Sequence, residues 1–449
     1  MKFCINILLI SLFSVLNQKV EPIFLPKQNL DNPEVALQWN KMTLLIAEKT
    51  PGNTPTFGSR SFGYIGLTMY ECIVEGTTTH QSIVSQLKGK ATIALIKPEK
   101  GKEYNWILSL NAGQAYIIKN LYETMQTSYK NKIDSLELEI FTKYSKKVSQ
   151  DVINRSVKYG QTIAQQIFEW SKTDGGHEGY LRNFDPNYPL PTTVGSWTVP
   201  TFSQSGSKYP LHPYWGKNRS FITANSELPL IKPLPYSTNI ASQCYAQFLE
   251  VYAKNQVLTV EEKETALWWS DDPSQTFTPP GHSYSLAAIA VKTANADLPK
   301  AAETFARVGM AVADAFIYCW KCKYTYHSER PPAFVHANID PSWKQFWPEP
   351  PFPAFPSGHS VQAAAAATVL TDLYGTDFKF IDNSHEGRKP DPLTFDLFKN
   401  RSFNSFWEAA EEAAYSRFLG GIHTRHDNDT GLVEGRKIGR NINALVWEK

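Results

Sequence analysis

The chain lacks the features that mark several classes of protein. Its 449 residues include only five cysteines, too few for a disulfide scaffold of this length. Its 45 basic and 43 acidic residues nearly cancel, which argues against a surface that wraps nucleic acid or coats an anionic membrane. The sequence contains no low-complexity tract and no fixed-period repeat. Any anion that this protein binds must therefore be held by a local cluster of basic side chains.

Long apolar runs are also missing, except for one at the N-terminus. Lys2 precedes the segment INILLISLFSVL (residues 5–16), which is too short to span a bilayer and is typical of an export signal. The alternative is a buried first helix. We predict a signal peptide over residues 1–20, no transmembrane segment, and a mature protein that is secreted or periplasmic. The cleavage site stays open because the sequence shows no clean small-x-small pattern.

What the sequence does contain is helical periodicity. Apolar residues recur at spacings of three and four in segments separated by Gly, Pro or polar breaks, which predicts an all-α fold. The predicted helices lie near 33–48, 60–76, 104–127, 131–147, 152–172, 238–254, 259–270, 282–295, 299–325, 359–374, 402–419 and 428–446.

Between these helices lies a long irregular stretch, 173–236, rich in Gly, Pro, Tyr and Trp. Loops of this length inside a compact protein are usually functional or connect two halves. We therefore predict two helical lobes: an N-terminal lobe at 21–236 that includes this connection, and a C-terminal lobe at 237–449.

Three short segments in the C-terminal half carry residues suited to binding an oxyanion. In the first, Lys323 and Arg330 are seven residues apart, so a helix would place both on one side before Pro331 discourages further helix. A lysine and an arginine at this spacing are more often a solvated helix face. The pair therefore indicates an oxyanion site only in combination with the other two segments.

The second segment is Pro356-Ser357-Gly358-His359, followed by an Ala-rich helical pattern. Ser357 is a typical N-cap residue, Gly358 allows close approach to the backbone, and His359 falls in the first turn. A helix start presents unpaired N–H groups and a partial positive charge, which favours anion binding. The alternative is an ordinary capped helix with an incidental histidine.

The third segment runs from Ser416-Arg417 through two glycines to His423 and Asp427. The glycines should end the preceding helix, which would free His423 to turn inward before the last helix begins near Asp427. Asp427 is four residues beyond His423 and can accept its second ring N–H, which would fix the tautomer. A capping role for His423 is the alternative.

Together the three segments resemble a known signature. The order Lys-x6-Arg-Pro, Pro-Ser-Gly-His and Ser-Arg-x5-His-x3-Asp is similar to the three-part motif of the type-2 phosphatidic acid phosphatase and vanadium haloperoxidase superfamily. Residues 50–71, 197–221 (WTVP…PYWGKNRSF) and 268–287 also resemble secreted bacterial vanadium haloperoxidases. The resemblance covers most of the chain and implies a large helical fold of that type, in which the segments converge on one oxyanion.

By motif position, the resemblance implies a set of ligands for a vanadate (V5+) cofactor or a phosphate: Lys323, Arg330, Ser357, Gly358, His359, Arg417 and His423. His423 would make the axial bond, and His359 would act as general acid–base on the opposite apical oxygen. Lys323 would also polarise bound peroxide through a hydrogen bond. Three fixed cations would neutralise the oxyanion and stabilise charge that develops on it.

Peroxidases and phosphatases share the motif, so the choice between them rests on other features. The lipid phosphatases carry it on membrane-spanning helices, which this sequence lacks, and the acid phosphatases of the group are compact, whereas a long helical segment precedes the motifs here. The resemblance thus favours a vanadate-dependent haloperoxidase, which oxidises halide with hydrogen peroxide to hypohalous acid and so halogenates small organic acceptors.

Two other functions are alternatives to a haloperoxidase. One is a secreted or periplasmic acid phosphatase with a phosphohistidine intermediate at His423. The other, a noncatalytic anion-binding protein, is disfavoured because binding alone does not require His359.

The resemblance also indicates how the pocket would be lined. Trp320 and Phe352 fall where haloperoxidases line the halide side, although either is more often a core residue. Iodide is the favoured halide, with bromide second. Asp271 and Asp272 would support the basic cluster from outside, and a charged surface loop is equally consistent with them. The polar loop at 376–394 is predicted as an insertion near the pocket mouth, and homo-oligomer formation stays open.

Overall fold

The computed structural model describes residues 30–449, except for 90–92, 94 and 392–397. The predicted signal peptide, residues 1–20, lies outside the described residues. In the part of the chain that is described, no helix is both long and apolar enough to cross a membrane. Helices form nearly all of the regular structure there, so the predicted all-α fold is confirmed.

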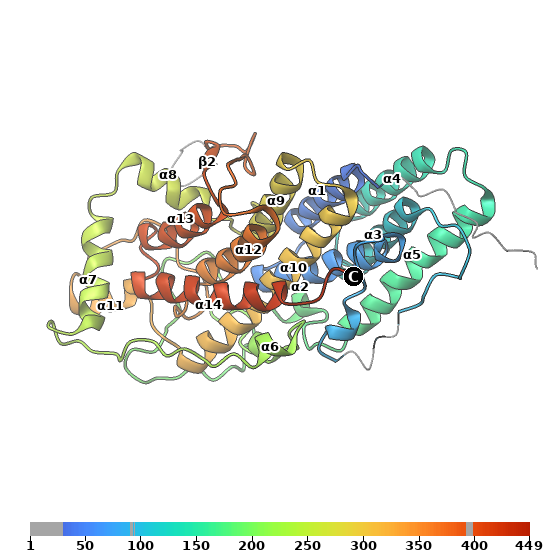
Figure 1. Ribbon diagram of the computed structural model, residues 1–449. Helices are drawn as coiled ribbons and strands as arrows, with labels where there is room; N and C mark the ends of the chain where they lie inside the picture. Colours follow the sequence, from blue (N-terminus) through green and yellow to red (C-terminus); the bar gives the residue numbers. More distant parts are fainter. Residues whose placement is uncertain (1–29, 90–92, 94, 392–397) are drawn as a thin grey trace, which may run out of the picture.

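Along the chain, the described residues form α-helices, short 3-10 helices and one small pair of strands. The α-helices are α1 (Glu34–Lys49), α2 (Pro55–Glu71), α3 (Trp106–Leu121), α4 (Thr127–Tyr144), α5 (Gln150–Ser171), α6 (Thr223–Ser226), α7 (Gln243–Asn255), α8 (Val260–Trp268), α9 (Thr278–Thr293), α10 (Leu298–Tyr326), α11 (Pro331–Asn338), α12 (Gly358–Tyr374), α13 (Phe406–Leu419) and α14 (Arg425–Asn443). The 3-10 helices are η1 (Val74–Gly76), η2 (Val84–Gln86), η4 (Gly179–Arg182) and η5 (Trp215–Lys217), and the strands are β1 (Phe380–Asp382) and β2 (Arg401–Phe403). Figure 1 shows α3, α4 and α5 at one end of the molecule and α7, α8 and α11 at the other.

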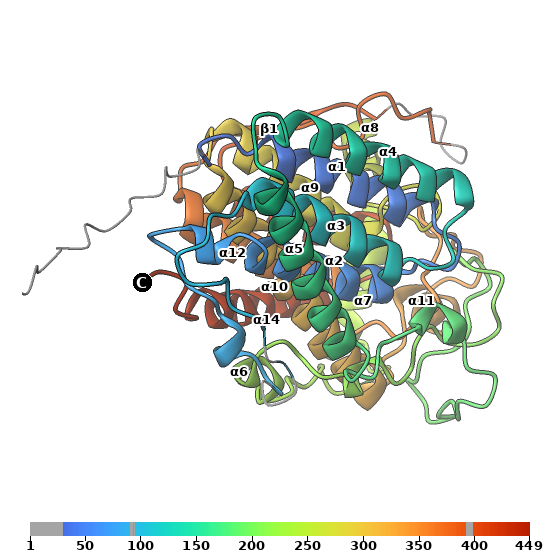
Figure 2. The same ribbon diagram turned by 90° about the vertical axis from the view of Figure 1, so that its right-hand side faces the viewer.

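The contact between α2 and α10 lies at the centre of the molecule, and both views show these helices among the others (Figures 1 and 2). A Cβ on Gly66 would fall against the carbonyl of Phe305, and one on Gly309 would fall against the carbonyl of Phe62. Because these glycines have no Cβ, the two helices pack backbone to backbone. The 29-residue α10 is buried along most of its length, and it carries Lys323 to the C-terminal half of the molecule.

A second close contact joins α12 and α14. Gly431, Gly435 and Gly439 are four residues apart, so they lie on one face of α14, and a Cβ on any of them would be 2.6 Å or less from an atom of α12. The Ala-rich run of α12 supplies the matching small side chains. This contact holds the starts of the two helices together, and the Ser357 amide donates to the Asp427 carbonyl over 3.1 Å.

Several helix boundaries differ from those predicted. The helix predicted at 60–76 is α2, which starts earlier because the Thr54 side chain accepts from the amide of Phe57 and Pro55 fits the first turn. The last helix starts two residues before the predicted Asp427. There the Thr424 side chain and Asp427 form a capping box.

The prediction that Pro331 ends a helix was wrong. The preceding helix, α10, already ends at Tyr326, where His327 takes a left-handed conformation with a φ of 49°. Pro331 instead begins α11, with Arg330 as its N-cap residue, because proline needs no N–H partner in a first helical turn.

The sequence also gave no sign of strands. β1 and β2 form an antiparallel pair with Phe380 opposite Phe403. Each strand has only three residues, which is too short for a period-two pattern to be recognised. The pair closes the loop between α12 and α13.

The predicted division into lobes at 21–236 and 237–449 stays a prediction. Helices from both sides of that boundary pack together, as α2 and α10 do, and one hydrophobic core contains residues of both. The irregular connection, 173–236, contains only η4, η5 and α6 among the elements described. It passes the end of α10, where the Trp197 amide donates to the His327 carbonyl over 2.6 Å.

Candidate functional site

The three motif segments meet around one cavity of about 300 Å³. Gly358 and His359 from the second motif line this cavity together with Ile422 and His423 from the third. Arg330 from the first motif lies against them, because its Nη1 is 2.9 Å from the Ile422 carbonyl and 3.3 Å from His423 Nε2. Segments nearly a hundred residues apart in sequence are therefore in direct contact here.

Lys323 is fully buried in the last turn of α10. Its ammonium donates to the carbonyls of Pro353 at 2.8 Å, Ala354 at 2.5 Å and Pro356 at 2.7 Å. These bonds occupy all three hydrogens of the ammonium. Burial is the main cause that lowers the pKa of Lys323 to about 7. Lys323 thus holds the loop that precedes α12, and a direct bond to an oxyanion requires it to release one carbonyl.

Arg330 and His423 form the next part of the site. His423 Nδ1 is 3.1 Å from Asp427 Oδ2, which places the proton on Nδ1 and leaves Nε2 as the nitrogen near Arg330. Burial and the nearby Arg330 lower the pKa of His423 to about 3, and burial lowers the pKa of Arg330 to about 10. A neutral imidazole can bind a metal through Nε2, and here Nε2 would have to give up its hydrogen bond from Arg330 to do so.

The start of α12 has polar atoms without partners. Ser357 is the N-cap residue, as its sequence position predicts, but its hydroxyl makes no capping hydrogen bond. Ser357 Oγ, His359 Nε2 and Arg417 Nη1 are all buried, and none has a hydrogen-bond partner. Buried polar groups without partners are uncommon and call for an explanation. An anion at this helix start would supply the missing partner for the serine and the arginine.

Arg417 reaches the site from the last turn of α13. Its Nε donates to Ser416 Oγ over 2.9 Å, and its Nη2 donates to the carbonyl of Ala266 in α8. Burial lowers the pKa of Arg417 to about 10, although the charges of Asp272 and Asp271 oppose this effect. Two guanidinium nitrogens are therefore fixed by the protein, and Nη1 remains for a ligand.

His359 lies in the first turn of α12 and lines the cavity. Burial, followed by the charge of Arg417, holds its pKa well below the usual value, while a hydrogen bond to the backbone of Trp269 acts in the opposite direction. Its Nε2 is buried and has no hydrogen-bond partner, so this nitrogen can take part in proton transfer.

Trp320 and Phe352 form an aromatic wall of the same cavity. Their ring centroids are 4.8 Å apart. The Phe352 ring centroid also lies 5.2 Å from Lys323 Nζ and 5.2 Å from Arg330 Cζ, so this wall stands against the buried cations. The halide-side role of the two aromatic residues stays a prediction.

Asp271 and Asp272 lie in another wall of the cavity, in the loop between α8 and α9. Asp271 is only 1% exposed. Burial raises the pKa of Asp272 to about 7, and the charge of Arg417 counteracts part of that rise. The loop is therefore turned into the molecule at Asp271.

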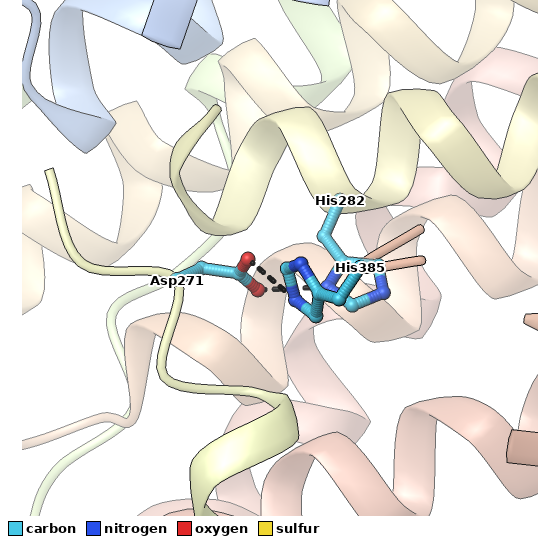
Figure 3. A group of neighbouring side chains, drawn as sticks. All are labelled: Asp271, His282 and His385. Carbon is cyan, nitrogen blue, oxygen red and sulfur yellow. Dashed lines mark hydrogen bonds and ion pairs between the residues drawn. The ribbon is translucent and has the colours of Figure 1, made fainter. Parts of the chain in front are cut away.

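Two histidines that the sequence analysis did not single out, His282 and His385, lie beside Asp271 (Figure 3), and Asp382 joins the cluster through His282. His282 Nδ1 in α9 is 2.7 Å from Asp271 Oδ2, and His282 Nε2 is 2.8 Å from Asp382 Oδ2 at the end of β1. His385 Nε2 is 3.2 Å from Asp271 Oδ1. Burial alone would lower the pKa of His282, but Asp271 and Asp382 raise it to about 10.

No local sequence pattern predicts this cluster of Asp271, His282, Asp382 and His385. His282 lies in a segment whose resemblance was noted, but nothing in the spacing links it to Asp271. Asp382 and His385 belong to the polar loop at 376–394, and a polar residue in such a loop becomes buried only through tertiary contacts. The signal is therefore absent from the sequence.

Known proteins resemble this chain over most of its length. Residues 303–448 match a family model described as the VCPO second helical-bundle domain. A vanadium chloroperoxidase of Curvularia inaequalis is 23% identical, over 91% of this chain and 82% of its own length. The crystal structure described as the first bacterial vanadium-dependent iodoperoxidase aligns with a TM-score of 0.79 and 28% identity, over 94% of this chain and 98% of that one. A holo-type bacterial vanadium-dependent chloroperoxidase aligns with a TM-score of 0.65 and 15% identity, over 88% of this chain and 92% of that one, which concerns the fold alone.

Proposed function

Since the chain belongs to the vanadium-dependent haloperoxidase family, we propose that it holds vanadate in the cavity at the start of α12 and oxidises iodide with hydrogen peroxide. Bromide is the second halide proposed, and small organic molecules are the acceptors of the hypohalous acid. The observation that carries the proposal is that Gly358 and His359 at a helix start line one cavity together with His423, and that the buried Arg330 contacts His423 from behind this lining. The similarity to the bacterial iodoperoxidase supports iodide.

The polar atoms at the cavity fit a vanadate oxyanion. Ser357 Oγ and Arg417 Nη1 are buried donors without partners, and Gly358 lines the cavity beside them. His423 would bind vanadate through Nε2, because Asp427 holds the proton on Nδ1. When bound, vanadate in its +5 state supplies a Lewis acid that activates hydrogen peroxide for attack by a halide.

The cations of the site would neutralise this oxyanion. Burial lowers the pKa values of Lys323, Arg330 and Arg417, so each charge is costly while no anion is near. Fixed arginine N–H groups bind oxyanions with defined geometry. Lys323 would act chiefly through its charge, since its three hydrogens already bond to carbonyls.

His359 is the proposed general acid–base. Its side chain lines the cavity, and its Nε2 is buried without a hydrogen-bond partner. We assign to Nε2 the proton that hydrogen peroxide loses and that water later gains. Positioned groups of this kind typically accelerate a reaction by about 10²–10⁴-fold.

Trp320 and Phe352 are the proposed halide wall. A halide beside Phe352 would lie close to the charges of Lys323 and Arg330, which favours an anion there. Iodide is the most easily oxidised of the halides considered, which agrees with the preference proposed here.

The test is a paired assay on one preparation stripped of vanadate. Iodide oxidation by hydrogen peroxide should appear only after vanadate is added, with bromide slower and chloride slowest. The same sample is assayed with a generic phosphate ester. Iodide oxidation that does not depend on vanadate contradicts the proposed cofactor, and a chloride rate above the iodide rate contradicts the proposed halide.

An acid phosphatase with a phosphohistidine at His423 is the second candidate, because the donors that fit vanadate also fit phosphate. It predicts ester hydrolysis that vanadate inhibits, together with no haloperoxidase activity. The two functions therefore give opposite responses to vanadate in the paired assay.

We also propose that the chain is exported and that residues 1–20 are its signal peptide. The basis is the apolar run at residues 5–16, which follows Lys2. Expression of the full chain in a bacterium with a periplasm, followed by mass measurement of the exported protein, tests this. A protein that stays in the cytoplasm with residues 1–20 intact contradicts it.

A further inference from the structure

The cluster around Asp271 lies outside the proposed vanadate ligands but beside them. It joins four parts of the fold: the loop after α8, α9, the end of β1 and the turn that follows β1. His282 is in contact with carboxylates on both ring nitrogens, and Asp271, His282 and Asp382 are each 1% exposed or less. A buried, ordered network of this size requires a reason.

The distances favour hydrogen bonds over a bound metal. Ligand atoms of Asp271, His282 and His385 lie within 4.8 Å of one another, a spacing that permits a metal ion. The His282 ring nitrogens, however, lie 2.7 and 2.8 Å from carboxylate oxygens, the length of charge-assisted hydrogen bonds. Two ligands on one tetrahedral zinc ion, each at about 2.0–2.1 Å, would be roughly 3.3 Å apart. His282 is therefore a buried imidazolium that donates to two aspartates.

The cluster holds the segment that follows α8. Trp268 donates from Nε1 to Asp382 Oδ2 over 2.8 Å, and its carbonyl accepts from His385 Nε2 over 3.0 Å. The next residue, Trp269, stacks on the His282 ring with centroids 4.4 Å apart. Bonds and stacking thus fix the backbone of this segment from several sides.

The same segment meets the proposed active site in two ways. The Ala266 carbonyl accepts a hydrogen bond from Arg417 Nη2. Asp271 and Asp272 line the cavity together with His359. Movement of the segment would release a nitrogen of Arg417 and shift the cavity wall that faces His359.

We propose that His282, clamped between Asp271 and Asp382, is a positioning residue that acts through the segment 266–272 on His359 and Arg417. The loop that carries Asp382 and His385 then serves the reaction from outside the cavity. This role in catalysis rests on the proposed haloperoxidase function. The expected effect on oxyanion binding does not rest on that function, because it follows from the contacts of Arg417 alone.

The experiment compares wild type with His282→Gln. Glutamine fills a similar volume, but it is uncharged and both of its N–H groups are on one nitrogen, so it cannot reproduce donors at the two separate ring-nitrogen positions of His282. Vanadate binding is measured by calorimetry on the stripped protein, and iodide oxidation is measured at saturating vanadate. We expect the dissociation constant for vanadate to rise about tenfold or more and kcat to fall about tenfold or more, with little change in the KM for iodide.

The matched control is His80→Gln. His80 is also a buried histidine beside a carboxylate, with Nε2 3.3 Å from Glu303 Oε2, but it contacts neither the cavity nor α8. Both variants should lower the melting temperature, whereas only His282→Gln should change vanadate affinity and kcat. If the role of His282 is purely structural, the two variants should show the same pattern of melting temperature, vanadate affinity and kcat.

A milder variant covers the case in which His282→Gln does not fold. Asp382→Asn keeps an acceptor for one bond and removes the charge, so we expect a smaller loss of affinity in the same direction. Unchanged vanadate affinity and kcat in folded variants overturn the proposal. Zinc or another metal present at one equivalent in wild type and lost in His282→Gln also overturns it, in favour of a metal site.

If the wild type binds vanadate but shows no haloperoxidase activity, the proposed function fails, and the binding measurements still decide the role of His282. If the wild type binds no vanadate, inorganic phosphate replaces it as the probe, because it presents the same tetrahedral oxygens to Arg417. The two failures are therefore distinguishable.

Discussion

Two buried histidines differ in their charge states: His423, which lines the cavity, and His282, which contacts Asp271 in the cavity wall. His423 has one carboxylate neighbour, Asp427, and a cationic one, Arg330, and its pKa is about 3. His282 lies between Asp271 and Asp382, and its pKa is about 10. Both side chains are almost fully buried. Burial alone would keep both neutral, so the neighbours decide the difference.

The comparison explains why only one of these histidines is suited to bind a cofactor. His423 is neutral and keeps Nε2 for a ligand, while Nδ1 is bonded to Asp427. His282 uses both nitrogens as donors, so it has no lone pair to offer. One histidine can therefore bind and the other can only hold its neighbours in place.

The largest effect should come from replacing the histidine that binds. His423→Ala removes the proposed axial ligand, and we expect the protein to lose vanadate during gel filtration and to have background activity. Vanadium content per protein, measured beside wild type, is the readout. Vanadate affinity equal to that of wild type would falsify the axial role of His423.

A smaller loss is expected for the histidine on the opposite side of the oxyanion. His359→Ala should retain measurable vanadate but lose about 10²–10⁴-fold in kcat, because the proton acceptor is gone. Equilibrium dialysis gives the binding and an iodide assay gives the rate. Loss of vanadate equal to that in His423→Ala would show that His359 mainly binds the cofactor and does not transfer protons.

The sequence predicts most of what surrounds His423 but little of what surrounds His282. The motif spacing placed Asp427 four residues after His423, and Asp427 in the first turn of α14 reaches back past the N-cap residue to His423. Helices that bury one face, such as α5, were likewise readable from periodicity. Local patterns of this kind predict which helices form, and only the helix boundaries differ in the structure.

The surroundings of His282 depend on tertiary contacts. Asp382 is a hundred residues from His282, and it reaches the ring only because β1 pairs with β2 beside α9. The occupied hydrogens of Lys323 were equally unreadable, because their carbonyl partners carry no sequence signature. Short strands, left-handed residues such as His327 and backbone acceptors are where a single sequence says least.

The smallest predicted effect concerns the pH dependence of stability in the protein without vanadate. The pKa of His282 is raised from 6.5 to about 10, so its charge stabilises the folded state fully below pH 6.5, and this contribution is lost as the pH rises towards 10. The pKa of His423 is lowered to about 3, so its contribution is full above pH 6.5 and is lost as the pH falls towards 3. The two histidines should thus act on opposite limbs of the stability curve.

Both limbs are measured by denaturant unfolding of wild type, His282→Gln and His423→Gln between pH 4 and 10. This range spans the titrations at roughly the ordinary histidine pKa. Subtracting each variant from wild type cancels groups such as Lys323 that titrate in all three proteins. The difference for His282→Gln should shrink by at least about 1.4 kcal/mol, one pKa unit, between neutral and alkaline pH. The difference for His423→Gln should shrink only on the acid side. Two differences with the same pH dependence would mean that the neighbouring carboxylates and cations do not set the two charge states, because burial alone treats both rings alike.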